Sequence, residues 1–167
     1  MAGGQVLTLK ESFSTRRHYL NQKHCMEVML ENGVIPIVNE NDTVSTDEIT
    51  SMGDNDTLAA IVSHCIHADL LVLLSDIDGL YTANPHTHPE AQLVPLVEEI
   101  TPEILALADG AGSALGTGGM STKLRAAKLV TADGADMVIA NGSHPELLYD
   151  IAEGKPAGTR FAGHKEG

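Results

Sequence analysis

The segment Leu70-Leu71-Val72-Leu73-Leu74 decides the fold, together with the turn Ser75-Asp76-Ile77-Asp78-Gly79 that follows it at once. The first half is apolar at every position, which is typical of a central strand in a parallel sheet, buried on both faces. The second half is polar and begins where that strand ends. Ligands of open α/β sheets bind beyond the carboxyl ends of the strands, so this turn is a candidate wall of a binding site.

Helical and extended patterns alternate on both sides of this strand, which predicts an α/β fold with a mostly parallel sheet. Gly33, Gly134 and Gly154 are expected to end three of the helices, and Pro36 favours an edge position for its strand. From Ala162 onward we expect a frayed polar tail. The pattern predicts helices at 12–32, 57–67, 102–108, 121–132 and 145–153, and strands at 34–38, 70–74, 93–97 and 137–140.

The composition bounds the class of protein. With 167 residues, 43 % of them hydrophobic, the chain is long enough to bury a core. Its net charge of −13 argues against a partner that is a nucleic acid or an anionic membrane. No apolar run is long enough to span a bilayer and no secretory signal opens the sequence, so we expect a cytoplasmic protein. Cys25 and Cys65 are expected to be small buried thiols rather than a disulfide.

The positive charges are unevenly spread. No lysine or arginine occurs between Lys23 and Lys123, although many aspartates and glutamates lie in that interval. An anionic ligand bound by this part of the chain would therefore meet few cations. Lys123 stands out because it falls in the first turn of a predicted helix, where the helix dipole disfavours a cation unless an anion compensates it.

Two polar loops precede the strand at 70–74. The first, Asn39-Glu40-Asn41-Asp42, follows the strand predicted at 34–38, and its amides and carboxylates could bind a small polar ligand. Ordinary turn chemistry explains the same residues. The second, Gly53-Asp54-Asn55-Asp56, opens a predicted helix. Capping that helix needs one residue, and here three polar groups follow a glycine, so the surplus could organise a ligand or hold a lysine in place.

A third loop, Gly116-Thr117-Gly118-Gly119-Met120-Ser121-Thr122-Lys123, runs into a helix. Its glycines permit close approach of the backbone, its hydroxyls can donate hydrogen bonds and its lysine can neutralise charge, which are the elements of a phosphate cradle. The spacing matches neither the Walker A motif nor the dinucleotide fingerprint. A flexible linker is the alternative, but linkers do not usually lead into a capped helix.

In this order the loops resemble those of the amino acid kinase family, and among its members those that phosphorylate glutamate. The resemblance runs from about Gly4 to Phe161, with residues 1–161 as a partial kinase domain and 162–167 as the polar tail. It implies a three-layer α/β/α sandwich with a mostly parallel sheet. The motifs that carry it are Asn39–Asp42, Gly53–Asp56, Ser75–Thr82, Gly116–Lys123 and Gly158-Thr159-Arg160-Phe161.

The resemblance also implies a reaction and a role for each motif. Similar enzymes use ATP with Mg²⁺ to convert L-glutamate to γ-glutamyl phosphate, the first step of proline biosynthesis. Two residues are implied to be catalytic, Asp56 by orienting lysines and Lys123 by reaching the transferred phosphate. The residues implied to contact glutamate are Asn39, Asp42 and Asn55. Those implied to contact the nucleotide are Ser75, Asp76, Thr117, Gly118, Gly119, Met120, Ser121, Thr122 and Lys123.

The chain also departs from the family pattern. Family members ordinarily begin with a strand that carries a lysine beside a Gly-rich turn, and the sequence has no such start. We therefore expect about the first third of the kinase domain to be missing, the activity to be impaired and the chain to form a homo-oligomer. The alternatives are a non-catalytic nucleotide-binding remnant, a partner of a full-length kinase, or another family member such as a uridylate or acetylglutamate kinase.

No residue is assigned as a protein ligand of a metal ion. His86 and His88 lie in a proline-flanked loop without further Cys or His at ligand spacing, so a solvated loop is the favoured interpretation.

Overall fold

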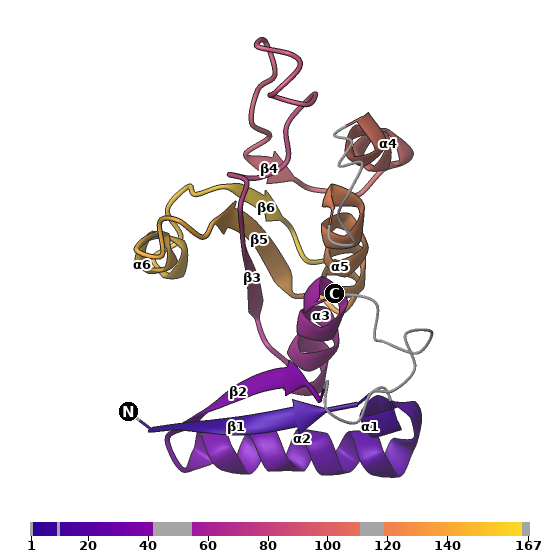
Figure 1. The fold of residues 1–167 in the computed structure, drawn as a ribbon, viewed down its shortest axis with the longest axis vertical. Coiled ribbons are helices and arrows are strands. Elements are labelled where there is room, and N and C mark those ends of the chain that lie inside the picture. The colour runs from indigo at the N-terminus through magenta and orange to yellow at the C-terminus, as the bar shows by residue number, and fades with distance from the viewer. Residues whose placement is uncertain (1, 10, 42–54, 111–118, 165–167) are drawn as a thin grey trace. The chain divides into compact units, whose positions relative to one another are not determined.

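The computed structural model describes residues 2–9, 11–41, 55–110 and 119–164 (Figure 1). The chain forms two compact units, Met1–His67 and Ala68–Gly167.

The first unit pairs two parallel strands and packs a long helix against them. Its elements are β1 (Ala2–Thr8), α1 (Glu11–Ser14), α2 (Arg16–Glu31), β2 (Val34–Glu40) and α3 (Asn55–Cys65). The register of β1 and β2 runs from Ala2 opposite Val34 to Thr8 opposite Glu40. Figure 1 shows α2 lying along this two-stranded sheet. Gly4 permits that packing, because a Cβ at Gly4 would lie 2.4 Å from Cε of Met29.

The helix predicted at 12–32 is in fact two helices. The break falls at Thr15, which has extended backbone and caps α2 by accepting a hydrogen bond from the His18 N–H at 3.3 Å. A side-chain cap of this kind competes with continuation of the helix, which is why the apolar pattern alone missed the break. The predicted end is confirmed: Gly33 has a φ of +70° and follows the last helical turn.

The strand predicted at 34–38 continues through Asn39 and Glu40, so these two residues belong to β2 rather than to a loop. Strand β1 was not predicted, because two glycines in Ala2–Thr8 weaken its β signal. Helix α3 begins at Asn55 and ends at Cys65, two residues before the predicted end. His67 leaves the helical conformation with a φ of +52°. Residues 42–54 lie outside the described residues, and they include Asp42 of the first polar loop and Gly53 and Asp54 of the second.

The second unit holds a four-stranded sheet. Its elements are β3 (Leu70–Ser75), β4 (Leu96–Val97), α4 (Pro102–Gly110), α5 (Met120–Ala132), β5 (Asp136–Asn141), α6 (Leu147–Ala152) and β6 (Thr159–Phe161). The strand order is β3-β5-β6-β4. The β3–β5 and β4–β6 pairs are parallel and β5–β6 is antiparallel, so the expected mostly parallel sheet is confirmed.

The prediction that the segment 70–74 is a central strand is wrong within this unit, because β3 is an edge strand of the four-stranded sheet. Leu70 and Leu74 are 37 % and 44 % exposed. An apolar run indicates that the side chains favour buried surroundings. It does not show whether the strand has a hydrogen-bonded neighbour on one side or on both.

Helices cover both faces of this sheet, as Figure 1 shows for α5 and α6. Val138 and Ala140 of β5 pack with Ile151 of α6 in a buried cluster. Met137 and Ile139, which alternate with them along β5, are fully buried. Successive side chains of a strand point to opposite faces, so these two lie on the face that α5 covers.

Other boundaries shift by small amounts. Helix α4 extends to Gly110, two residues beyond the end predicted at residue 108. Of the strand predicted at 93–97 only Leu96–Val97 is a strand, and Leu93 forms an isolated antiparallel bridge with Tyr81. Helix α6 is shorter than the predicted 145–153. Strand β6 was not predicted, because three residues are too few to show a period.

Two further expectations are wrong. The chain does not fray directly after Phe161, because the N–H groups of Ala162, Gly163 and His164 donate to the Val97 carbonyl, Asp136 Oδ1 and the Thr131 carbonyl. Cys25 is exposed, because it lies on an outer face of α2, whereas Cys65 is buried and burial raises the pKa of its thiol.

Among the described residues, no helix combines the length and the apolar character that crossing a bilayer requires.

Gly158 and Gly154 give a matched pair of substitutions that tests this packing. Both have positive φ, +64° and +75°, but a Cβ at Gly158 would lie 1.9 Å from the Ile139 carbonyl oxygen, and a Cβ at Gly154 would meet nothing within 4 Å. Gly154→Ala should cost about 1–2 kcal/mol through the left-handed backbone alone. Gly158→Ala should cost about 2–5 kcal/mol, because backbone must also move. Urea unfolding measures both, and equal losses would contradict the close contact.

Candidate functional site

A cavity of about 250 Å³ lies at the carboxyl end of β3, and we call it the β3 pocket. Its walls come from two places in the chain, the loop that follows β3 and the start of α5. Five residues that the sequence singled out line it: Ser75, Asp76, Gly119, Met120 and Lys123. The remaining lining residues are Ile77, Gly79, Leu80, Tyr81, Ala83, Asn84, Pro85 and His86.

Lys123 brings a buried positive charge to this pocket. It stands in the first turn of α5 with 8 % of its surface exposed. The residue before the helix is Gly119, which has no side chain to cap the helix, and the Thr122 hydroxyl donates back to the Gly119 carbonyl at 2.7 Å. A helix N-terminus and an ammonium group both favour an anion, so this end of the pocket is suited to a phosphate.

Ser75 and Asp76 line the pocket where β3 ends. The Ser75 hydroxyl donates to Asp76 Oδ1 at 3.1 Å. The Ser75 carbonyl accepts a hydrogen bond from the Gly142 N–H at 2.7 Å, which joins the ends of β3 and β5. Among the described lining residues Asp76 is the only carboxylate, and carboxylate oxygen is a ligand that Mg²⁺ accepts. A single carboxylate is suited to a Mg²⁺ ion whose other ligands are mainly phosphate oxygens of a nucleotide.

Thr159 holds the base of the long loop between β3 and β4. Its side chain is fully buried, and its Oγ1 accepts from the Leu80 N–H at 2.8 Å and donates to the Val94 carbonyl at 2.7 Å. The Val94 N–H donates to the Leu80 carbonyl at 2.8 Å, so the two ends of the loop are also joined directly. Gly79 leaves room for this contact, since a Cβ there would lie 2.4 Å from Thr159 Oγ1.

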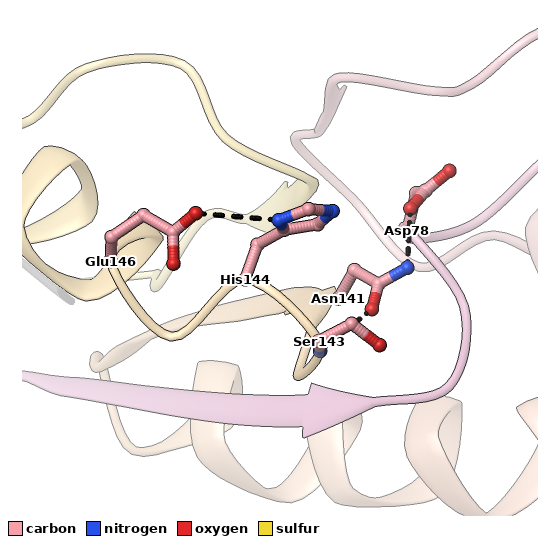
Figure 2. Close-up of polar contacts among 5 residues, drawn as sticks. All are labelled: Asp78, Asn141, Ser143, His144 and Glu146. Carbon is pink, nitrogen blue, oxygen red and sulfur yellow. Dashed lines mark hydrogen bonds and ion pairs between the residues drawn. The ribbon is translucent and has the colours of Figure 1, made fainter.

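A second polar cluster sits beside the pocket, centred on Asp78. Its carboxylate accepts from the Asn141 Nδ2 at 2.8 Å and from the Tyr81 hydroxyl at 2.9 Å. Figure 2 shows Asp78 and Asn141 pointing toward one another from the turn after β3 and the end of β5. The hydrogen bonds from Asn141 and, to a smaller extent, Tyr81 lower the pKa of Asp78, and the same contact raises the pKa of the Tyr81 hydroxyl.

The sequence analysis did not assign Thr159, Asp78 or Asn141 to the site. Thr159 was part of a motif, but the sequence does not show that its hydroxyl reaches residues far away along the chain. Asp78-Gly79 is equally typical of an ordinary turn. Asn141 follows a predicted buried strand directly, so the rule that ligands bind at the carboxyl ends of strands could have identified it.

Other candidate residues lie away from the β3 pocket. Ser121 and Thr122 are in the first turn of α5 but do not line the pocket. In the first unit, Asn39 and Asn55 line a separate cavity of about 250 Å³, together with Val38, Leu58, Ala59 and Val62. Asp56 is next to Asn55 in the first turn of α3 and is partly buried. Asp42, Thr117 and Gly118 lie outside the described residues.

The fold agrees with the comparison against known families. Residues 1–141 match the amino acid kinase family, and the chain belongs to that family.

The most similar curated relatives that we compared are glutamate 5-kinases. That of Deinococcus radiodurans is 49 % identical over 164 residues, which is 98 % of this chain and 45 % of the relative. That of Clostridium perfringens is 49 % identical over 164 residues, 96 % of this chain and 61 % of the relative. That of Myxococcus xanthus is 51 % identical over 160 residues, 96 % of this chain and 42 % of the relative. The chain thus spans about half the length of the curated relatives it matches.

Solved structures support the same fold. The carbamate kinase of Giardia lamblia bound to AMP-PNP has a TM-score of 0.62 at 22 % identity, over 86 % of this chain and 50 % of the other. The isopentenyl phosphate kinase of T. acidophilum has a TM-score of 0.65 at 19 % identity, over 96 % and 60 %. At these identities the likeness concerns the fold, and the expected α/β class is confirmed.

Thr159→Val tests whether Thr159 anchors the long loop. The substitution keeps the shape but leaves the buried Leu80 N–H without its acceptor and removes the donor to Val94, so we expect a loss of about 1–3 kcal/mol in the free energy of unfolding. Thr87→Val is the control, because Thr87 lies at the exposed tip of the same loop; its effect should stay within about 0.5 kcal/mol. Urea unfolding measures both variants, and an unchanged Thr159→Val protein would contradict the anchor.

Proposed function

We propose that this chain binds ATP with Mg²⁺ in the β3 pocket and serves the phosphorylation of L-glutamate to γ-glutamyl phosphate, the first step of proline biosynthesis. The observation that carries the proposal is the convergence of Ser75, Asp76 and Lys123 on one cavity at a helix N-terminus. The similarity to glutamate 5-kinases supports the choice of substrate.

The β3 pocket supplies the groups that a triphosphate needs. The Lys123 ammonium and the N-terminus of α5 would face the phosphates, and Asp76 would face the bound Mg²⁺. When bound, Mg²⁺ offsets negative charge on the phosphates. Phosphoryl transfer depends mainly on positioning and on charge neutralisation, so a buried lysine is the residue that we assign to the transferred phosphate. Thr117 and Gly118 belong to the same proposed phosphate loop.

The cavity of the first unit supplies amides suited to an amino acid. Asn39 reaches it from β2 and Asn55 from the first turn of α3. An amide can donate to a carboxylate and accept from an ammonium group, which are the two kinds of charged group that glutamate carries. We therefore assign Asn39 and Asn55 to glutamate, with Asp42 beside them in the sequence and Asp56 as the residue that orients lysines.

Lys123→Ala should weaken binding of MgATP about 10- to 100-fold while changing binding of adenosine less than about twofold, because the lost charge acts on phosphates. Lys128→Ala is the control, since Lys128 is an exposed lysine of the same helix and should leave both ligands unaffected. Titration calorimetry measures each affinity. Equal losses for ATP and adenosine would remove Lys123 from the phosphates, and no heat at millimolar nucleotide with folded protein would overturn the proposed function.

The isolated chain should turn over glutamate slowly. Among the described residues that line the β3 pocket Lys123 is the only lysine or arginine, and kinases offset the charge of the transition state with several cations. Each missing donor costs on the order of 10²–10³ in rate. We expect turnover lower than that of a full-length glutamate 5-kinase by at least this factor, measured by coupled ADP release with glutamate, ATP and magnesium.

Asp56→Ala is the control for that assay. Robust glutamate-dependent turnover that disappears in Asp56→Ala would show that the shortage of cations does not limit this chain. Binding of nucleotide without any turnover would favour the second candidate, a nucleotide-binding protein that pairs with another kinase chain. The supporting observation is that the described lining residues of the pocket include a single lysine.

A further inference from the structure

Asp78 occupies an unusual place beside the β3 pocket. It is not one of the lining residues, yet Ile77 and Gly79 on either side of it are. Its carboxylate points instead to Asn141 and Tyr81. Tyr81 connects the two, since it lines the pocket and its hydroxyl donates to Asp78.

Asn141 connects this turn to the sheet. It is the last residue of β5 and pairs with Ser75, the last residue of β3, in the parallel register. Its Nδ2 donates to Asp78, and its Oδ1 accepts from the Ser143 N–H at 2.9 Å, so both ends of the amide are engaged (Figure 2). The amide is thereby oriented with its donor side toward Asp78, and it cannot rotate without losing both hydrogen bonds.

We propose that Asp78 and Asn141 are positioning residues that hold the turn after β3 against the end of β5, and so set the place of Tyr81 in the wall of the nucleotide pocket. This inference rests on the proposed binding of nucleotide in the β3 pocket. Neither Asp78 nor Asn141 is proposed to contact the nucleotide. Asp78 acts through Tyr81 and through the backbone of Gly79.

We call the contact between Asp78 and Asn141 the clamp, and its chemistry supports a positioning role. The carboxylate receives one hydrogen bond from the end of β5 and one from Tyr81 of its own loop, and hydrogen bonds to an ionised acceptor are stronger than those between neutral groups. Those contacts lower the pKa of Asp78, because they stabilise its ionised form. Because Asp78 is exposed, water competes with both donors, so we expect its loss to weaken nucleotide binding moderately rather than to unfold the protein.

An exchange of the two side chains tests the clamp. Asn141→Asp alone brings a second carboxylate against Asp78, and we expect MgADP to bind about tenfold more weakly. In the double variant Asp78→Asn with Asn141→Asp, the amide at position 78 donates to the carboxylate at position 141 and still accepts from Tyr81, so affinity should return to within about twofold of the original protein. A role in general stability alone does not predict this rescue.

Two further variants complete the experiment. Tyr81→Phe removes only the hydroxyl and should weaken MgADP by about two- to threefold. Glu146→Gln is the matched control: Glu146 is an exposed carboxylate on the same segment that pairs with His144 at 3.3 Å, and its loss should change nothing (Figure 2). Calorimetry with MgADP measures affinity, and thermal unfolding shows that each variant is folded.

The outcomes separate the two proposals. If the original chain binds MgADP, and Asn141→Asp binds equally well or the double variant does not recover, the clamp is wrong while the proposed function stands. If the folded original chain does not bind MgADP, the proposed function is wrong and the clamp falls with it. Weakening by Asn141→Asp with recovery in the double variant supports both.

Discussion

The parallel pairing of β3 with β5 is the constraint on which the rest of the second unit depends. Its register places Ser75 opposite Asn141, so the two strands end at the same level. Each strand leads into a polar segment there, and the Gly142 N–H closes the gap by donating to the Ser75 carbonyl at 2.7 Å. A shift of one residue would turn every side chain of β3 to the opposite face and would separate Asp78 from Asn141.

Charge is the second constraint. The chain carries a net charge of −13, and the long interval between Lys23 and Lys123 contributes no lysine or arginine. Lys123 is nevertheless buried, at a helix end where the dipole disfavours a cation. A helix N-terminus and an ammonium group both attract anions, so their meeting at this place suits this end of the β3 pocket to a phosphate.

The sequence predicted the helices and strands whose apolar residues follow a clear pattern along the chain. The helices α4, α5 and α6 and the strands β3 and β5 were recognised, with small errors at their ends, because each has a run or a stripe of apolar residues in the sequence. The errors lie where a single side chain decides the conformation. Thr15 breaks one helix into two, and three residues suffice for β6 because Thr159 and Phe161 are buried while Arg160 is exposed.

The same distinction holds for the candidate site. Ser75, Asp76 and Lys123 could be chosen in advance, because strand ends and helix starts are visible in the sequence and the family resemblance supported them. Thr159 could not, because its importance arises from hydrogen bonds to Leu80 and Val94, which are distant in sequence. Asp78 appeared to be half of an ordinary Asp-Gly turn until its partner on β5 was known.

The reversed direction of β6 has a consequence for how the family can vary. Because β6 runs antiparallel to β5, its first residue, Thr159, lies at the end of the sheet where the β3 pocket opens. The loop between β3 and β4 is therefore fastened at its base, while its far end around Pro89 and Glu90 is exposed. Ala83, Asn84, Pro85 and His86 of this loop line the pocket, so only the part beyond them, around Pro89 and Glu90, can gain or lose residues without changing the pocket wall. Evolution can alter the length of the loop there at little cost to the fold.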